Sequence, residues 1–424
     1  MEKRNQKALF GWIILTVSIA SAVAVYFITG LSWIFLSILI INILAVMLFR
    51  KQFSRNALAI CRILIGLLFI FSGFVKGVDP MGTIFKMEEY MGAYGTEWAI
   101  SLAPLAAIVM ILLEFSLGCF ALFNIKPKLT TIGVGIMMVG FTILTFVDAI
   151  ANPVSDCGCF GDAVKMSNWQ TFYKNLVIDA ILLVLILNYG KLKTRNSNIL
   201  QFSIGGFIVV LFLGMEIHAY YNMPIIDFLP WKVGEKAIQD ERLPVQFYYT
   251  VENKNTGEKI ERLYDKSLMA DMVDSTWQAN WKMGTRRDVD PNEYKHNLRI
   301  VDGYNHDITS SLLEADYPLL IATIYNIDKS HKKALERLKL LQEELQKDDE
   351  YYLIMLVAGS SEEAQLFAEN YDLNFPVYTA DDVEVKMMNR SNPGLLLLKN
   401  KIVQDKWDYH HIPDYNLIKK IHTK

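Results

Sequence analysis

Two cysteines separated by a single glycine are the residues of this chain best suited to chemistry. Cys157, Gly158 and Cys159 stand in the segment Asp-Cys-Gly-Cys-Phe-Gly, between two apolar stretches. Two thiols at this spacing can form a small disulfide ring, because Gly158 has the backbone freedom to bring both Cα atoms to bonding distance. Strain makes such a bond more reducible. The segment therefore favours a redox couple, with Cys157 and Cys159 as the catalytic pair. Its supporting residues are Gly158, Phe160 and Gly161.

Two other roles for the pair remain open. The same spacing allows a purely structural disulfide. Two thiolates can also bind a soft ion such as copper(I), although no histidine lies nearby and Met166 is the one neighbouring methionine. The other two cysteines, Cys61 and Cys119, lie in apolar stretches, where buried thiols usually pack as small hydrophobic groups. The histidines show no convergent spacing, so no metal site is expected.

The apolar stretches predict a multi-pass α-helical membrane protein. The chain has 424 residues, of which 52% are hydrophobic, and windows of about 20 apolar residues recur through its first half. Such a window is long enough to cross a hydrocarbon core of about 30 Å. The seven expected spans are residues 9–28, 33–49, 57–75, 98–123, 129–150, 172–188 and 199–220.

Lysine and arginine predict how these spans are oriented, since flanking positive charge stays on the cytoplasmic side. One set of loops holds eleven cations, whereas the opposite short loops hold only Lys76, Lys86, Lys165 and Lys174. We therefore expect a bacterial inner membrane protein with a cytoplasmic N-terminus. The cysteine loop and the chain after residue 221 then lie in the periplasm, where disulfide chemistry is favoured. The first span resembles a signal peptide, but we expect it to be retained as a hairpin with the second.

These spans and the soluble sequence after them predict five segments. The expected segments are an N-terminal transmembrane hairpin (1–55), a four-helix membrane domain with the cysteine loop (56–190), a seventh span (191–222), an irregular or β extension (223–315) and an α/β domain (316–424). The net charge of -3 gives no reason to expect a nucleic-acid partner. The expected partners are the lipid bilayer and an extracytoplasmic protein.

Polar residues within the predicted third and fourth spans fall at helical spacing. Arg62 and Lys76 stand at the two ends of one helical face that also contains Gly66 and Gly73. Glu114 lies well within the fourth span, where an isolated carboxylate is costly and needs a partner. We expect that partner to be Arg62, because the two spans are antiparallel neighbours. The pair is either a structural ion pair or a site that handles protons or a quinone headgroup.

Three further features are expected close to the cysteine loop. Asp148 and Asp179 lie near the outer ends of the fifth and sixth spans, where they either take up protons from oxidising thiols or serve as solvated helix ends. Residues 84–94 alternate apolar and charged side chains. This pattern predicts a short helix on the membrane surface that covers the cysteine loop, or else a simple connector.

Residues 57–190 resemble the four-helix MauE/DoxX group of bacterial membrane proteins. The resemblance rests on Cys61-Arg62-Ile63-Leu64 with Ser72-Gly73-Phe74-Val75-Lys76, on Glu114-Phe115-Ser116-Leu117-Gly118, and on Cys157-Gly158-Cys159-Phe160-Gly161. It implies redox work in the membrane: MauE is linked to disulfide formation in a periplasmic dehydrogenase of methylamine utilisation, and DoxX relatives to quinone reduction by sulfur compounds. A membrane quinone is therefore a cofactor implied by resemblance alone.

The sequence after residue 316 resembles a thioredoxin fold. Strand and helix patterns alternate, a strand pair spans the Lys399-Asn400 turn, and a helix closes the chain. Pro393 stands where that family has its cis-proline. The redox motif should follow the first strand, but residues 326–333 contain no cysteine, and neither does the rest of residues 222–424. His331 at this position is expected to be solvated. The domain therefore either binds a partner through Arg390, Asn392 and Pro393, or is a degenerate module for assembly.

Together these patterns predict a candidate quinone-coupled thiol/disulfide oxidoreductase. Cys157 and Cys159 would exchange electrons between an extracytoplasmic protein thiol and the quinone, and the sequence does not choose which thiol is the nucleophile. The alternative is a non-enzymatic scaffold that presents the thioredoxin-like domain to envelope partners. A transporter is disfavoured by the scarcity of broken helices and central polar sites.

Overall fold

The computed structural model describes residues 53–154, 157–193, 197–237, 246–289, 298–347 and 350–422, together with Leu44. The predicted spans at 9–28 and 33–49 lie outside these residues except for Leu44, and Asp156 of the cysteine segment also lies outside them. The chain forms two units, Met1–Phe228 and Leu229–Lys424.

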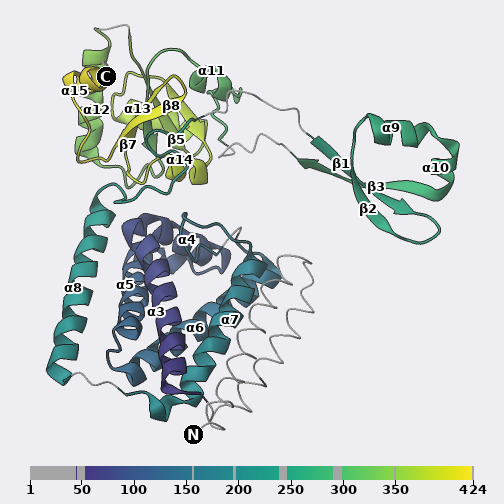
Figure 1. Cartoon of the computed structure of the whole chain (residues 1–424). Helices are drawn as coiled ribbons and strands as arrows, with labels where there is room; N and C mark the ends of the chain where they lie inside the picture. Colours follow the sequence, from purple (N-terminus) through teal and green to yellow (C-terminus); the bar gives the residue numbers. More distant parts are fainter. Residues whose placement is uncertain are drawn as a thin grey trace. The chain divides into compact units, whose positions relative to one another are not determined.

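The first unit is a bundle of apolar helices (Figure 1). Within the described residues, five helical segments are long and apolar enough to cross a membrane. They are α3 (Arg55–Val78), η2 with α5 (Glu97–Leu102 and Ala103–Leu122), α6 (Pro127–Ala151), α7 (Asn168–Leu187) and α8 (Asn198–Tyr221). The shorter α4 (Pro80–Ala93) follows α3, and the 3₁₀ turn η3 (Tyr189–Lys191) follows α7. The predicted multi-pass helical membrane core is confirmed.

Polar residues at the helix ends hold the loop between α6 and α7. The C-cap of α6 is Asn152, which adopts the left-handed conformation with φ 47°. Ser167 and Gln170 form a capping box at the start of α7. Asn168 then joins the two ends, because its side-chain amide donates to Asn152 Oδ1 at 2.8 Å and to the Val154 carbonyl at 3.0 Å. The cysteine segment thus lies in a loop that is closed at its base.

Helices α3 and α5 pack antiparallel and very closely. A Cβ atom on Gly73 would lie 2.7 Å from the backbone nitrogen of Phe115, and one on Gly66 would lie 2.9 Å from the carbonyl oxygen of Gly118. Both distances are too short for a side chain, so glycine is required for this approach. The predicted small-residue face of α3 therefore packs against α5.

The second unit begins with a small antiparallel sheet in the order β2-β1-β3. Its strands are β1 (Gln246–Asn253), β2 (Lys259–Leu263) and β3 (Trp281–Val289). Two short helices, α9 (Lys266–Val273) and α10 (Ser275–Asn280), connect β2 to β3.

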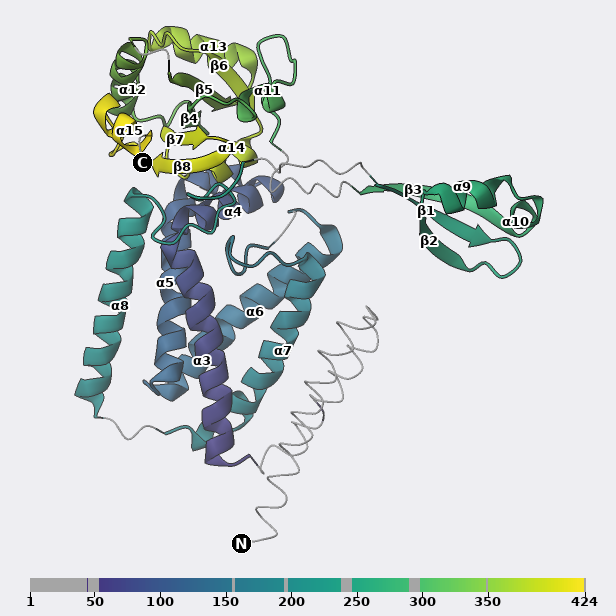
Figure 2. The ribbon, with the colours of Figure 1, turned by 45° about the horizontal axis from the view of Figure 1, so that its top comes forward.

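A five-stranded mixed sheet in the order β6-β5-β4-β7-β8 forms the centre of the remaining chain (Figure 2). Strand β4 pairs in parallel with β5 and antiparallel with β7. Its strands are β4 (Leu319–Ile324), β5 (Tyr352–Ala358), β6 (Val377–Ala380), β7 (Gly394–Lys399) and β8 (Ile402–Trp407). Its helices are α11 (Thr309–Leu313), α12 (Lys332–Leu345), α13 (Ser361–Asn370), α14 (Asp382–Met388) and α15 (Tyr415–His422).

Both faces of this sheet are covered, as expected for strands that are apolar along their whole length. Alternate residues of β4 such as Leu320 and Ala322 join a core with α12, α13 and α15, whereas Leu319 and Ile321 join the opposite core with α11 and α14. The Asn392-Pro393 peptide bond before β7 is cis. The predicted thioredoxin-like α/β domain is confirmed. Strand β6 and helix α14 were not predicted. They are only four and seven residues long, too short for a clear periodic pattern of apolar residues.

Candidate functional site

The two thiols of the cysteine loop lie side by side. Cys157 Sγ and Cys159 Sγ are 3.0 Å apart, and both cysteines are free and partly exposed. Gly158 has φ +63°, a conformation that a side chain would strain, and its carbonyl accepts a turn hydrogen bond from the Gly161 nitrogen at 2.9 Å. The predicted catalytic pair is therefore brought together by a turn that needs glycine.

Helices α3 and α7 hold this loop in place. The Ser72 hydroxyl donates to the Cys159 carbonyl at 2.7 Å. The ring of Phe160 packs against Phe71 at a centroid distance of 5.5 Å, and Lys174 Nζ lies 4.4 Å from the centroid of the same Phe160 ring. Phe160 thus anchors the loop between an aromatic ring of α3 and a cation of α7.

A buried ion pair lies below the loop. Lys76 Nζ is 2.6 Å from Glu114 Oε2, and both side chains are about 95% buried. The predicted pairing of Arg62 with Glu114 is wrong. Arg62 instead donates through Nη1 to the carbonyl oxygens of Ala121 and Leu122, the latter at 2.8 Å.

The stagger of the two helices explains this correction. The prediction placed Arg62 beside Glu114 because both residues lie toward the cytoplasmic half of two antiparallel neighbouring spans. The contacts of Gly66 with Gly118 and of Gly73 with Phe115 shift the helices along their axes. Arg62 therefore meets the last turn of α5, where a positive charge is favourable beside the carbonyls of a helix C-terminus. Lys76 is the cation that reaches Glu114.

A second polar pair lies on the other side of the loop. The Tyr90 hydroxyl, on α4, donates to Asp148 Oδ2 on α6 at 2.6 Å. Asp148 is fully buried. The same α4 contacts the loop, because a Cβ on Gly158 would lie 3.3 Å from Lys86 Cγ. The predicted short helix is thus present and touches the cysteine loop.

Asp179 lies away from the thiols, contrary to the prediction that it stands near the outer end of its span. It accepts a hydrogen bond from Thr142 at 2.7 Å in the middle of α7. Thr142 precedes Asp148 by six residues on α6, which corresponds to about 9 Å of helix. Helix α7 begins at Asn168, four residues earlier than the predicted span, so Asp179 falls deeper than expected.

The two thiols have opposite electrostatic surroundings. The hydrogen bond with Cys157 and the nearby cations Lys174 and Lys76 together lower the pKa of Cys159 to about 6, against the effect of burial. The same hydrogen bond, together with burial, raises the pKa of Cys157. The cations Lys174 and Lys76 thus give Cys159 the surroundings that better stabilise a thiolate.

The remaining cysteines lie within the bundle. Cys61 on α3 and Cys119 on α5 are 2% and 6% exposed, and Cys61 belongs to an apolar cluster with Ile65 and Phe69. These thiols fill space in the core, as their sequence context predicted.

In the second unit, two of the residues predicted to bind a partner make hydrogen bonds within the fold. Asn392 Oδ1 accepts hydrogen bonds from the backbone nitrogens of Tyr325 and Asn326 at 3.1 and 3.4 Å, and its Nδ2 donates to the Asn326 carbonyl at 2.6 Å. Arg390 donates to the Lys386 carbonyl at 3.2 Å. Asn392 thus holds the residues that follow β4, and Arg390 bonds to the last turns of α14; partner recognition by Arg390, Asn392 and Pro393 stays a prediction.

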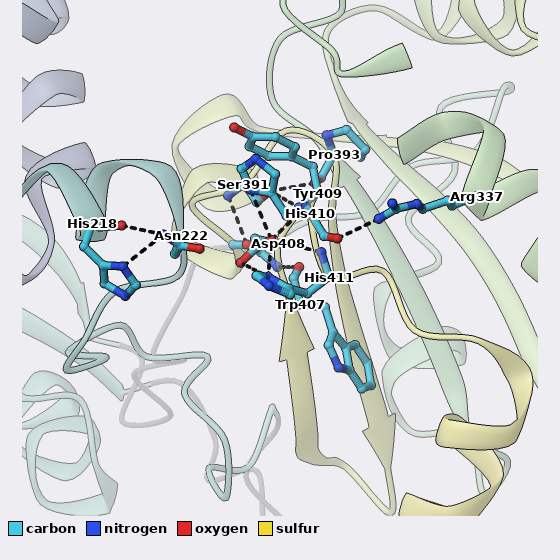
Figure 3. Close-up of polar contacts among 11 residues, drawn as sticks. His218, Asn222, Arg337, Ser391, Pro393, Trp407, Asp408, Tyr409, His410 and His411 are labelled. Carbon is cyan, nitrogen blue, oxygen red and sulfur yellow. Dashed lines mark hydrogen bonds and ion pairs between the residues drawn. The ribbon is translucent and has the colours of Figure 1, made fainter. Parts of the chain in front are cut away.

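A hydrogen-bonded cluster fixes the segment around Pro393 (Figure 3). The Ser391 hydroxyl donates to the Pro393 carbonyl at 2.7 Å and accepts from the Tyr409 nitrogen at 2.8 Å. The Asp408 carboxylate contacts His411 Nδ1 at 2.9 Å. Next to this segment, His331 is exposed, as predicted, and one side of its ring lies against Tyr409 at a centroid distance of 4.7 Å.

Sequence reasoning missed three residues of the cysteine site. The three residues, Tyr90, Ser72 and Lys174, belong to three different helices. Ser72 and Lys174 contact the loop and Tyr90 bonds Asp148 beside it, in each case only through the tertiary fold. Ser72 stood within the motif that supports the family resemblance, and Lys174 was one of the few cations of the outer loops. Tyr90 had no sequence signal beyond its place in the amphipathic segment.

Comparison with known proteins agrees with this architecture. Residues 54–189 match a family model described as Methylamine utilisation protein MauE, so this part of the chain is a MauE family domain. The predicted resemblance is confirmed over about a third of the chain.

A curated relative is Protein TlpB from Flavobacterium psychrophilum, which is 28% identical over 158 residues. The alignment spans 36% of this chain and 42% of the relative. The chain thus matches less than half of that protein's length. Overall, fold and comparisons define a membrane protein with a MauE family domain followed by a thioredoxin-like domain.

Proposed function

We propose that this protein is a membrane thiol/disulfide redox protein in which Cys157 and Cys159 alternate between two thiols and a disulfide. The electrons are exchanged with a protein thiol or disulfide outside the cytoplasm. The supporting observation is the 3.0 Å contact between two free thiols that have unequal neighbours. A purely structural disulfide would need the two sulfurs to lie close together, but it would not need different charged neighbours around each of them.

The two cysteines have different roles in this proposal. Cys159 is the nucleophile, because Lys174 and Lys76 stabilise its thiolate. Cys157 keeps its proton, donates a hydrogen bond to Cys159, and later resolves the mixed disulfide that Cys159 forms with a partner. The buried Glu114 balances Lys76 and holds it below the loop.

The proposed location is the bacterial inner membrane, with the N-terminus in the cytoplasm and the C-terminal domain in the periplasm. The distribution of lysine and arginine between the loops supports this orientation. An oxidising compartment on the cysteine side is compatible with a disulfide that forms and is reduced in turn.

A membrane quinone as second redox partner follows from the family resemblance alone. The bundle has an apolar groove lined by Thr131, Gly135, Val139, Ile186 and Tyr189. The nearest of these on α6, Val139, precedes Asp148 by nine residues, or about 14 Å of helix. This groove suits an apolar tail but does not bring a headgroup to the thiols. The exchange with a protein thiol proposed above does not itself require a quinone.

A non-enzymatic scaffold is the second candidate function. It is favoured by one observation, a thioredoxin-like domain that contains no cysteine. In that case the membrane bundle anchors the domain, and neither thiol is needed for function.

Glutathione disulfide, a defined small disulfide, separates these two functions. The reduced full-length protein in detergent is mixed with it at pH 8, quenched with acid and analysed by peptide mass spectrometry. Cys157→Ser should accumulate glutathione on Cys159, whereas Cys159→Ser should react at Cys157 at least about tenfold more slowly. Cys61→Ala with Cys119→Ala is the matched control and should leave both rates unchanged. Equal, slow labelling of all four cysteines would leave the scaffold as the better account.

A further inference from the structure

The hydroxyl of Tyr90 lies between the cysteine loop and a buried carboxylate. It donates to Asp148 Oδ2 at 2.6 Å and also interacts with the thiol of Cys157. Asp148 is 0% exposed, and its second oxygen, Oδ1, has no hydrogen-bond partner in the described part of the chain. A buried carboxylate with a free oxygen atom has the capacity to take up a proton.

Helix α4 fixes the position of this hydroxyl. Lys86 precedes Tyr90 by one helical turn and packs on Gly158. The ring of Tyr90 stacks on that of Tyr94 with centroids 6.2 Å apart and an interplanar angle of 5°. The loop and the hydroxyl are therefore positioned by the same short helix, and α6 supplies the carboxylate.

From this arrangement we infer that Tyr90 and Asp148 form a proton relay that deprotonates Cys157 when it attacks a mixed disulfide on Cys159. The inference rests on the function proposed above and adds catalytic roles for Tyr90 and Asp148. A relay is useful because Cys157 has to lose its proton before it attacks, and a thiol is a poor nucleophile until it does so.

The step balances as an exchange between one thiol and one disulfide. Cys159 first attacks a partner disulfide, forming Cys159–S–S–R and releasing the other half as a thiolate. Cys157 Sγ then attacks Cys159 Sγ: the Cys157–Cys159 bond forms, the bond from Cys159 to R breaks, and R leaves as a thiolate. The Cys157 proton passes to Tyr90 Oη while the Tyr90 proton passes to Asp148 Oδ2. Two electrons have then moved from the loop to the partner, which is the oxidant.

The charges around the two sulfurs support different roles for Cys159, the attacking thiolate, and Cys157, the thiol that gives up its proton. Cys157 faces Tyr90 of α4, Asp148 of α6 and Cys159. Asp148 itself faces Lys86 of α4 and Tyr94, the residue that follows this helix. Cys159 faces Lys76 of α3, Glu114 of α5 and Lys174 of α7. The cations beside Cys159 stabilise an anion, whereas the carboxylate beside Cys157 can accept its proton.

The test follows the glutathione adduct in time. Reduced full-length protein with both cysteines present is mixed with glutathione disulfide at pH 6 to 9, and samples are quenched with acid for mass spectrometry. Tyr90→Phe and Asp148→Asn should form the Cys159 adduct at the parent rate but resolve it about 100-fold more slowly at pH 7. In both variants resolution should speed up steeply with pH, because hydroxide replaces the relay.

A matched buried pair serves as the control. Thr142→Val and Asp179→Asn remove a similar hydroxyl and carboxylate from the same bundle, about 9 Å of helix deeper than Asp148. They should resolve the adduct as the parent does. Resolution by Tyr90→Phe with the parent rate and pH profile would overturn the relay. A loss of both adduct formation and resolution, with no pH dependence, would indicate a structural role and also overturn it. Failure of Cys159 to form any adduct would instead reject the redox function itself.

Discussion

Gly118 of α5 lies against the backbone of α3 so closely that a Cβ atom there would be 2.6 Å from the nitrogen of Ile70. This contact is one of three glycine contacts that set the stagger of α3 and α5, together with those of Gly66 and Gly73. The stagger places Lys76 beside Glu114 and below Cys159. The charge next to the redox pair therefore depends on small residues that lie away from the thiols.

Gly118→Ala should force the two helices apart. We expect it to destabilise the bundle by about 2 kcal/mol, the typical cost of overpacking a close contact. Gly140→Ala on α6 is the matched control, because a Cβ there meets nothing within 4 Å. Thermal unfolding of both variants in detergent compares them, and an equal midpoint would refute the close-packing argument.

Breaking the buried Lys76–Glu114 pair from one side should be costly. Lys76→Met leaves the carboxylate buried without its cation and should destabilise the protein by about 3 kcal/mol. Glu114→Gln should have a comparable effect, and the double variant should be less destabilised than the two single effects added together. A double-mutant cycle by chemical unfolding measures this coupling. Strict additivity would mean that the two side chains do not interact.

The reactivity of Cys159 should depend on pH through its thiolate. With the pKa lowered to about 6, alkylation of Cys159 by iodoacetamide should rise tenfold per pH unit below 6 and level off above it. Cys157→Ala removes the largest cause of that shift, so the midpoint should move up toward the ordinary thiol value of about 8.5. The rate of Cys159 alkylation at pH 7 should then be at least about tenfold lower in Cys157→Ala than in the parent protein.

Lys174→Met provides an intermediate case in the same experiment. Lys174 lowers the pKa of Cys159 less than the hydrogen bond with Cys157 does. The midpoint of the pH dependence of alkylation in Lys174→Met should therefore lie between those of the parent and Cys157→Ala. Peptide mass spectrometry separates Cys159 from the other three cysteines. Midpoints near 8.5 in all three proteins would show that the surroundings do not activate this thiol.

Asn392→Ala should loosen the loops around the cis-proline. It removes the acceptor for two backbone nitrogens and a donor to the Asn326 carbonyl, each costing about 1 kcal/mol or more. Hydrogen exchange of the Tyr325 and Asn326 amides in the full chain should become at least about tenfold faster. Asn370→Ala, at an exposed position at the end of α13, should leave it unchanged. Unaltered hydrogen exchange in Asn392→Ala would show that this side chain does not hold the loops around the cis-proline.

Much of the architecture was predictable because it depends on periodicity. Windows of apolar residues gave the membrane helices, and alternating strand and helix patterns gave β4, α12, β5 and α13. The glycine face of α3 was also predictable, since helical spacing alone places Gly66 and Gly73 together.

The finer geometry of the site could not be predicted in the same way. Spacing within one helix does not fix how far it slides along its neighbour, so Arg62 was assigned to Glu114 in place of Lys76. Tyr90 reaches Asp148 because α4 folds back over the loop, which no local pattern reveals. The polarity of Arg390 and Asn392 likewise did not distinguish internal hydrogen bonding from partner recognition.

The redox state of the loop in native membranes tests the central claim most directly. Membranes are treated with a mass-tagged maleimide, with and without prior reduction, in Cys61→Ala/Cys119→Ala protein so that only the loop thiols react. We predict a mixture of doubly tagged and untagged chains that moves to full tagging on reduction and back on adding a disulfide oxidant. Chains that remain entirely untagged until denatured and reduced, or entirely tagged after oxidant, would contradict a pair that cycles.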